Sequence, residues 1–183
     1  MTERVADFFD DALEALSEDM SEATQRLRAQ DSQFNRRVYI KTFFAFLEGF
    51  AWALRKATID LMHYNALKHD KLNIDRLILL REEFPTLDNT GKLSFRKHQL
   101  PFISYFAFTL RSFAEEQHFD PDFFVDIGWG HFQKAVKIRD RLTHPKRKQD
   151  MSVSNAELGI LVKTQTWFQH TVMARIDKAR ASG

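Results

Sequence analysis

The sequence predicts an all-α protein, folded as a single-domain bundle of about five or six helices. The 183 residues include only 6 Gly and 4 Pro, too few to punctuate a strand-rich fold, whereas 44% of them are hydrophobic and 18 are Phe. Apolar residues also recur at helical spacing through most of the chain. A chain of this length most simply forms one domain with a sizeable core. We therefore expect one helical domain over residues 1–183, with an irregular excursion at 84–99 and a frayed C-terminus at 181–183.

The first third of the chain predicts two long helices. The first runs from about Thr2 to Gln30, and the second begins at Asp31 or Ser32 and reaches about Asn65. The middle of the second helix is apolar nearly all round, which is typical of a central buried helix. The apolar stripe of the first helix consists of Val5, Phe8, Phe9, Ala12, Leu13, Leu16 and Met20.

A short helix and an irregular segment follow. Residues 74–84 predict a helix that stops at Pro85, because proline interrupts a helix. The next segment, PTLDNTGKLSFRKHQ, is the least regular part of the chain and forms an excursion between helices that could contain a small hairpin. Pro101 suits the first turn of the next helix.

The last third predicts two more helices with defined ends. Asp120 and Pro121 resemble an N-cap followed by a first-turn proline. A helix should then run from about His131 to Thr143, since a residue that precedes a proline is pushed out of the α region. Ser154 and Glu157 have the spacing of a capping box and open the final helix.

Charge is unevenly distributed although the net charge is only +2. Residues 1–24 carry eight acidic side chains and one basic side chain, whereas residues 134–150 carry seven bases and two acids. Such a local excess of positive charge attracts a polyanion even in a nearly neutral molecule. Alternatively, the basic segment faces the acidic first helix, in the same chain or in a partner.

Composition excludes several classes of site. The chain has no Cys, which excludes disulfides, thiol nucleophiles and Cys-based metal sites. The first residues, MTERVADFFDD, are acidic and lack the apolar segment of a secretory signal. The longest apolar stretch, FFAFLEGFAWAL, contains Glu48 and is too short to span a bilayer. We therefore expect a cytoplasmic protein with no membrane partner.

The most informative segment is IRDRLTHPKRK, Ile138–Lys148. A guanidinium and an imidazole at the end of a helix can together bind a phosphate and move a proton near neutral pH. Arg139 and His144 would lie about 140° apart on a regular helix, but Pro145 ends the helix and lets His144 turn towards Arg139. Asp140 could accept a hydrogen bond from the His144 ring and set its tautomer. Alternatively, His144 caps the helix and the cations complement its dipole.

The string R-D-R-L-T-H-P-K resembles the signature of HEPN domains, a family of all-α proteins of bacterial conflict systems and RNA processing. The family motif is an Arg, then a polar residue, then a His after a gap of four to six residues. Arg139, Asp140 and His144 occupy these positions. A second Arg–His pair, Arg111 and His118, lacks the matching context. The resemblance extends more weakly over about residues 32–179, so the predicted bundle would be HEPN-like.

This resemblance implies a metal-independent endoribonuclease that needs no cofactor. His144 would act as acid or base on the ribose 2′-hydroxyl or the leaving oxygen, Arg139 would bind the scissile phosphate, and Asp140 would orient or tune them. The products would be a 2′,3′-cyclic phosphate and a 5′-hydroxyl. The resemblance also implies a homodimer with a composite cleft, and a toxin or anti-phage effector with an antitoxin or other regulatory protein as partner.

Two other functions remain open. Some family members have lost catalysis and bind RNA or a nucleotide without cleaving it. A helical interaction protein, whose basic end docks on an acidic surface, is the other alternative.

Five further residues are candidates for substrate binding, and four of them follow the catalytic motif or lie within it. The Thr143 hydroxyl could contact a phosphate or could bond a carbonyl of its own helix. Lys146, Arg147 and Lys148 could follow an RNA backbone or form a solvated loop.

Glu48 is the fifth candidate and lies in the most apolar helix. It could form a salt bridge with Arg139 and position it, or it could face solvent or meet Arg55 or another cation, which we favour. Trp129, His131 and Phe132 could stack a base, but aromatic residues at helical spacing more often belong to the core, which we favour as well.

Overall fold

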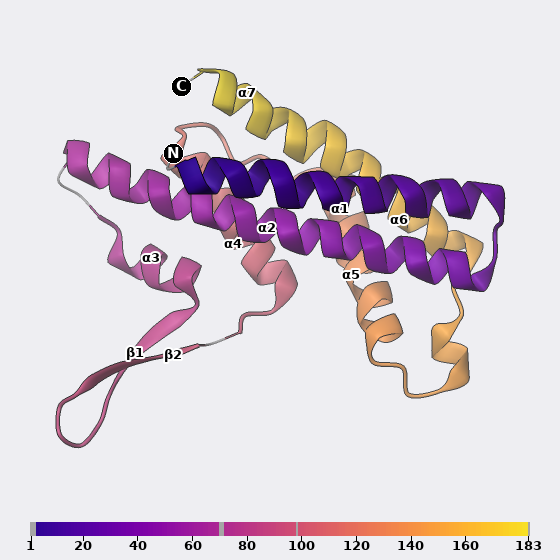
Figure 1. Cartoon of the computed structure of the whole chain (residues 1–183), viewed down its shortest axis with the longest axis horizontal. Coiled ribbons are helices and arrows are strands. Elements are labelled where there is room, and N and C mark those ends of the chain that lie inside the picture. The colour runs from indigo at the N-terminus through magenta and orange to yellow at the C-terminus, as the bar shows by residue number, and fades with distance from the viewer. Residues whose placement is uncertain (1–2, 70–71, 98, 183) are drawn as a thin grey trace. The chain divides into compact units, whose positions relative to one another are not determined.

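The fold is all-α, as predicted. The computed structural model describes residues 3–69, 72–97 and 99–182, and the side chains of residues 13–179 within these ranges. The described residues form α1 (Glu3–Ala29), α2 (Gln33–His69), α3 (Ile74–Arg81), β1 (Glu83–Leu87), β2 (Leu93–Lys97), α4 (Phe102–Glu116), α5 (Ile127–Thr143), the 3₁₀ turn η1 (Lys148–Met151), α6 (Asn155–Trp167), the π-helical turn η2 (Phe168–Met173) and α7 (Ala174–Ser182) (Figure 1). Because α6, η2 and α7 follow one another without a break, the described chain contains six continuous helices and one hairpin.

Contacts between Cα atoms divide the chain into two compact units. The first, which we call the hairpin unit, comprises Met1–Ala6 and Ala51–Asp120. The second, which we call the motif unit, comprises Asp7–Phe50 and Pro121–Gly183 and contains the whole RDRLTHPK segment. The helix α2 contributes its first half to the motif unit and its second half to the hairpin unit. No helix in the described part of the chain is long and apolar enough to cross a membrane.

In the hairpin unit, α3 ends earlier than the sequence predicts. Asn73 caps its start by accepting a hydrogen bond from the backbone N–H of Arg76. Glu82 ends it with a left-handed backbone (φ 53°), and its N–H donates to the carbonyl of Leu79. Pro85 therefore does not stop the helix but lies within β1. The left-handed residue reverses the chain direction, which is a common way for a helix to end.

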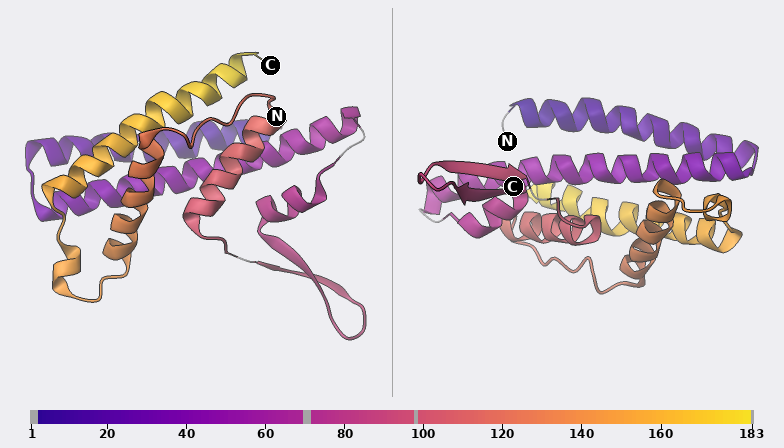
Figure 2. Two further views of the ribbon diagram at one scale, coloured as in Figure 1. Left: turned by 180° about the vertical axis from the view of Figure 1, so that it is seen from behind. Right: turned by 90° about the horizontal axis from the view of Figure 1, so that it is seen from below.

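The expected excursion at 84–99 is largely a regular hairpin. The strands β1 and β2 pair antiparallel, with Glu83 opposite Lys97 and Leu87 opposite Leu93. The turn between them is held by the Asp88 carboxylate, which accepts hydrogen bonds from the N–H groups at positions 90 and 92. Figure 2 shows the two strands extending away from α3 as an arm. His98, which belongs to the predicted excursion, lies outside the described residues.

Each unit has its own apolar core. In the hairpin unit, Met62, Leu77 and Leu80 are buried and pack with Ile59, Leu72 and Phe108. In the motif unit, α2 supplies four buried aromatic side chains, and the rings of Phe50 and Phe168 pack edge to face with centroids 4.9 Å apart. The fully buried side chains of the motif unit include Tyr39, Ile40, Phe43, Phe44, Leu47, Phe50, Phe132 and Phe168.

The start of α5 differs from the prediction, whereas its end does not. Residues 120 and 121 are irregular and residues 122–126 form turns and bends, so Asp120 is not an N-cap. The cap is Asp126, whose carboxylate accepts a hydrogen bond from the backbone N–H of Gly128. The helix consequently starts at Ile127, before His131, and ends at Thr143 as expected. A capping carboxylate satisfies an N–H group that would otherwise lack a partner at the start of the helix.

The last helix begins as predicted but is not uniform. The Ser154 hydroxyl accepts from the N–H of Glu157, and the Glu157 carboxylate accepts from the N–H of Ser154, which confirms the capping box. The π-helical turn η2 then interrupts the α-helix before α7. The helix continues to Ser182, so the expected fraying at 181–183 is not seen up to that residue; Gly183 lies outside the described residues.

The stripe predicted for the first helix can be followed only in part. The side chains of its first four members lie outside the described ones. Leu13 and Leu16 are half-buried and Met20 is buried. A Cβ atom at Gly49 would lie within 2.5 Å of the Leu16 side chain, which shows how closely α1 approaches α2 within the motif unit.

Tyr39 should make the stability of the motif unit fall at alkaline pH. Its hydroxyl donates to the Gln165 amide oxygen at 2.7 Å, and burial raises the pKa of Tyr39 to about 12. Because the folded-state pKa lies above the unfolded value of about 10, the stability contributed by the neutral phenol is complete below about pH 10 and is lost as the pH rises towards 12. We expect Tyr39→Phe to cost about 1 kcal/mol at neutral pH, and this difference to shrink at alkaline pH. Urea unfolding followed by circular dichroism at both pH values measures it, and a constant difference would contradict the prediction.

Candidate functional site

Arg139 is held in place by two carboxylates and an aromatic ring. Its guanidinium forms ion pairs with Glu48 of α2 and with its neighbour Asp140, where Nη1 lies 3.0 Å from Oδ1. Its Cζ atom also lies 5.7 Å from the centre of the Phe44 ring, a cation–π arrangement. Phe44 and Glu48 are four residues apart and so share one face of α2. The Arg139 side chain remains 24% exposed, so a ligand can still reach it.

Glu48 forms the salt bridge with Arg139, which was the alternative that we favoured less on sequence grounds. It pairs with Arg139, while Arg55 pairs with Glu82 at 2.8 Å instead. The Glu48 side chain is 44% exposed, so the carboxylate avoids the desolvation that a buried charge would suffer. A role of Glu48 in positioning Arg139 is therefore consistent with the geometry.

His144 ends α5 through its main chain and leaves its ring exposed. Its N–H donates to the carbonyl of Asp140 at 2.9 Å, and its backbone (φ −123°, ψ 58°) is no longer helical. The imidazole forms no hydrogen bond with any residue that the structure describes. The bond expected between the Asp140 carboxylate and this ring is not formed, because the carboxylate is turned to Arg139. The ring is therefore accessible from solvent, and no group in the described part of the chain sets its tautomer.

Thr143 uses its hydroxyl locally. The Oγ1 atom donates to the carbonyl of Arg139 at 2.9 Å, one turn earlier in α5. Of the two alternatives for Thr143, the structure therefore has the bond to a carbonyl of its own helix. The hydroxyl oxygen can then only accept further hydrogen bonds. A hydroxyl that already donates its proton is a poor donor to a phosphate.

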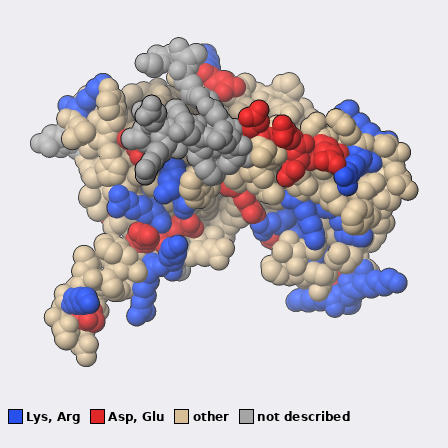
Figure 3. All heavy atoms as spheres, viewed as in Figure 1, with Lys and Arg blue, Asp and Glu red and all other residues tan. Residues whose placement is uncertain are grey.

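The three cations after Pro145 form an exposed basic loop, defined here as Lys146, Arg147 and Lys148. All three side chains are exposed, and none forms an ion pair with a described residue. Figure 3 shows Lys and Arg side chains gathered where α5 ends and the following loop begins. The loop thus presents its charge to solvent, which suits contact with a polyanion.

Asp150 fixes the backbone of this loop. Its Oδ2 atom accepts hydrogen bonds from the N–H groups of Lys146 and Arg147 at 3.0 and 2.9 Å. Desolvation raises the pKa of Asp150. The two N–H groups and the charges of Arg147 and Arg141 together lower it by more, so the pKa of Asp150 lies below its usual value. The loop is therefore ordered by a carboxylate that stays ionised at neutral pH.

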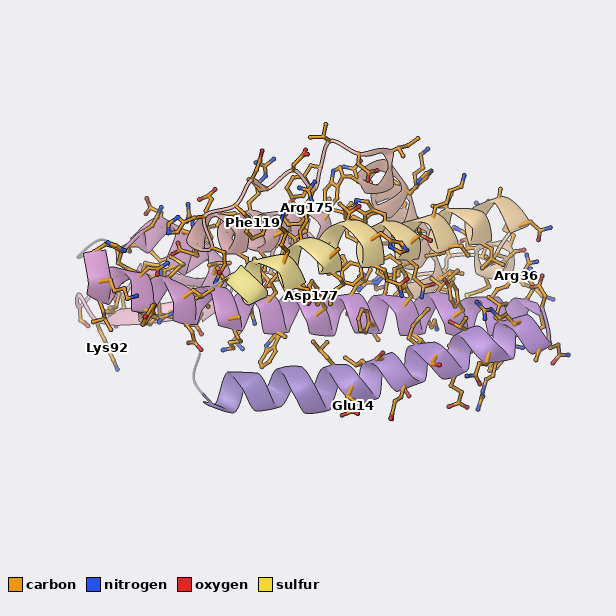
Figure 4. All side chains as sticks on the ribbon, turned by 90° about the horizontal axis from the view of Figure 1, so that it is seen from above. Glu14, Arg36, Lys92, Phe119, Arg175 and Asp177 are labelled. Atoms are coloured by element: carbon orange, nitrogen blue, oxygen red, sulfur yellow. The ribbon has the colours of Figure 1, made fainter. Side chains whose placement is uncertain are left out.

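Two arginines that the sequence analysis did not select anchor the rest of the connection between α5 and α6. Arg141 donates to the carbonyls of Asp150 and Ser152 at 2.6 and 2.8 Å and pairs with Glu157 at 2.6 Å. Arg36, which Figure 4 shows near the start of α2, donates to the carbonyl of Val153 at 2.7 Å. No local sequence pattern marks these contacts, because most of the partners are backbone carbonyl groups and Glu157 lies 16 residues from Arg141.

The acidic side chains of α1 do not neutralise the basic segment within the described part of the chain. The described α1 carboxylates form one ion pair, between Glu22 and Arg26 of the same helix. Figure 4 shows Glu14 on the side of α1 that faces away from α2, and Figure 3 shows the acidic side chains along α1. The bases of segment 134–150 that do form ion pairs use Glu48, Asp140 and Glu157 instead. The alternative of an intrachain contact between the two charged segments is thus not observed among these residues.

Comparison with known proteins does not assign the chain to a class. No family model matches it, and neither a curated protein nor a solved structure matches it. Interpretation of the site therefore depends on its own chemistry.

Proposed function

We propose that this protein is a metal-independent endoribonuclease of the HEPN type. The observation that carries the proposal is the end of α5, where a positioned, partly exposed Arg139 precedes an exposed and unpartnered His144. A fixed guanidinium and a free imidazole are the two groups that cleavage of RNA by its own 2′-hydroxyl requires. The exposed basic loop lies directly after them in the chain and supplies further positive charge.

The proposed reaction assigns one task to each side chain. The His144 imidazole removes the proton from a ribose 2′-hydroxyl, whose oxygen then attacks the adjacent phosphorus. The bond from phosphorus to the 5′-oxygen breaks, and the leaving oxygen takes a proton from the His144 imidazolium, directly or through a water molecule, which returns the imidazole to its neutral form. The products are a 2′,3′-cyclic phosphate and a 5′-hydroxyl. Arg139 binds the non-bridging oxygens and offsets the negative charge that develops on them, while Glu48 and Asp140 orient its guanidinium.

One observation favours a second function, binding of RNA without cleavage. Arg139 already has two carboxylate partners, so a phosphate must compete with Glu48 and Asp140 for the guanidinium. In that case the basic loop would supply most of the affinity, and His144 would have no task. Both functions predict RNA binding that weakens with salt, because released counterions drive association with a polyanion.

Cleavage of labelled single-stranded RNA by the purified protein in excess EDTA separates the two functions. The ribonuclease proposal predicts fragments that end in a 2′,3′-cyclic phosphate and no cleavage of a DNA of the same sequence, which lacks the 2′-hydroxyl. Binding with no cleavage at any pH between about 5 and 9 would support the binding function instead. Absence of both binding and cleavage would exclude both functions.

The family resemblance extends the proposal to assembly and regulation. Pairing of two chains would bring two motif helices into one composite cleft, and a toxin or anti-phage effector would need an antitoxin or another regulatory protein. Sedimentation of the purified protein tests the homodimer, and growth arrest on induced expression tests the toxin.

Glu48→Gln tests whether Glu48 positions the Arg139 guanidinium for cleavage or only competes with the phosphate for it. The substitution removes one of the two carboxylates that hold Arg139 and one competitor of the phosphate. We expect kcat for RNA cleavage to fall about tenfold or more, since a misplaced guanidinium stabilises the transition state less well, while KM stays equal or falls. The cost in stability should be at most about 1 kcal/mol, because the pair is partly exposed. An unchanged kcat would show that Glu48 does not position Arg139.

A further inference from the structure

The hairpin unit contains an open, polar cavity of about 650 Å³. It lies between the second half of α2, the end of α3 and the base of the hairpin. Its size falls within the range of small-molecule sites in proteins. All of its lining residues belong to the hairpin unit, so the cavity is separate from the Arg139 site.

Cations outnumber carboxylates in the lining of this cavity. The cations are Arg55, Lys56, Arg81 and Lys97, and the carboxylates are Glu82 and Glu83. Glu82 is bound to Arg55 at 2.8 Å, and Glu83 stands opposite Lys97 in the hairpin. Within the described part of the chain, neither Lys56 nor Arg81 pairs with a carboxylate; the Arg81 guanidinium has only the His63 ring, at 3.4 Å. Figure 3 shows basic and acidic side chains next to one another over α3 and the start of the hairpin.

A buried polar cluster holds one of the cavity cations, Arg55, in place. The Tyr105 hydroxyl is buried and interacts with the Thr109 hydroxyl and the Arg55 guanidinium. The Arg55 Cζ atom lies 5.5 Å from the centre of the Tyr105 ring, so the donors belong to one cluster. Buried N–H and O–H groups almost always have acceptors. This cluster and Glu82 thus hold the Arg55 guanidinium in place, and Arg55 lines the cavity.

Trp52 adds an aromatic surface to the same cavity. Its side chain is 36% exposed although it lies in a largely buried helix, and the Lys56 ammonium lies 5.6 Å from its ring centre. Aromatic side chains next to cations are the usual surroundings of a nucleobase attached to a phosphate, since the ring stacks and the cations bind oxygens. A bare inorganic anion would make no use of the ring.

We propose that this cavity binds a nucleoside phosphate, with the phosphates on Lys56, Arg81 and Arg55 and the base against Trp52. A free nucleotide and the phosphorylated end of an RNA share this chemistry. The site is independent of the proposed ribonuclease function because it shares no residue with it.

Calorimetric titration of the full chain with ATP in excess EDTA tests the proposal. We expect saturable binding that weakens between about 50 and 200 mM salt. The double variant Lys56→Gln/Arg81→Gln should bind ATP about tenfold more weakly or worse, since each charge-assisted contact is strong. Lys68→Gln is the matched control: Lys68 also lies on α2 and over an aromatic ring, that of Tyr64, but it does not line the cavity. Circular dichroism checks that all variants are folded.

Tripolyphosphate and RNA complete the experiment. Trp52→Phe should weaken ATP binding but leave tripolyphosphate binding unchanged. In a separate competition, displacement of ATP by a 5′-triphosphorylated RNA would identify an RNA end as the ligand. No displacement would identify the free nucleotide. Arg139→Ala should retain ATP binding, which separates this proposal from the ribonuclease. No ATP binding at millimolar concentration, or equal losses in the Lys68 control and the double variant, would overturn the proposal. Equal affinity for ATP and tripolyphosphate would overturn the assignment of the base to Trp52.

Discussion

His144→Ala is expected to slow RNA cleavage by about 10²–10⁴-fold, the range in which a general acid or base contributes to catalysis. RNA binding should change little, because Arg139 and the three cations of the basic loop remain. Arg139→Ala should reduce cleavage by at least a comparable factor and weaken binding as well, because it removes a charged contact to the phosphate. Single-turnover cleavage in EDTA, together with a separate binding measurement, gives both quantities.

The second Arg–His pair of the chain provides matched controls. Arg111 is an exposed arginine of α4, and His118 is an exposed histidine with a left-handed backbone (φ 57°). Arg111→Ala and His118→Asn should leave cleavage unchanged; Asn is chosen because it tolerates a positive φ. If the controls lose activity as severely as the motif variants, the activity does not depend on Arg139 and His144. A contaminating nuclease would be indicated by cleavage that survives in the His144→Ala/Arg139→Ala double variant.

Gly128→Ala should lower the stability of the folded protein more than Tyr39→Phe, Glu48→Gln or Gly130→Ala. A Cβ atom at this position would lie 2.1 Å from Cδ1 and 2.6 Å from Cβ of Trp167, whose side chain is 4% exposed and packed against Trp129 and Phe132. The clash involves the base of a buried side chain, so either α5 or α6 must shift. We expect a loss of about 2 kcal/mol in the free energy of unfolding, within the range for overpacked cores.

Gly130→Ala tests the same helix without the clash. Nothing lies within 4 Å of the Cβ position at Gly130. Alanine is preferred to glycine in a helix by about 0.5–1 kcal/mol, so this variant should be as stable as the parent or more so. Urea unfolding curves of both variants measure the contrast. Equal stabilities would show that α5 and α6 are not packed at Gly128 as described.

Local signals in the sequence predicted the elements well where a side chain acts on its own backbone. The Ser154–Glu157 capping box and the end of α5 before Pro145 are found where they were expected. Predictions failed where a competing local group decided the outcome. Glu82 ends α3 before Pro85 can do so, and Asp126, not Asp120, caps α5. In both cases several residues in a short stretch could serve as the boundary, and the packing of the flanking segments selects one.

The sequence by itself determined the all-α class and the position of Arg139, Asp140 and His144 at the end of a helix, because helix formation and helix ends depend on residues within one or two turns. Only the tertiary structure decided that Glu48 and Phe44 hold Arg139, that Asp140 turns to Arg139 and not to His144, and that Arg141 and Asp150 order the basic loop. The same holds for the cavity at Trp52, which combines α2 with α3 and the hairpin. The contacts of Arg139 with Glu48 and Phe44, and the cavity, join segments far apart in the chain, and no periodic pattern encodes them. Asp140 and Asp150 act within a few residues, but a side chain chooses among charged partners by their distance and burial after the helices have packed.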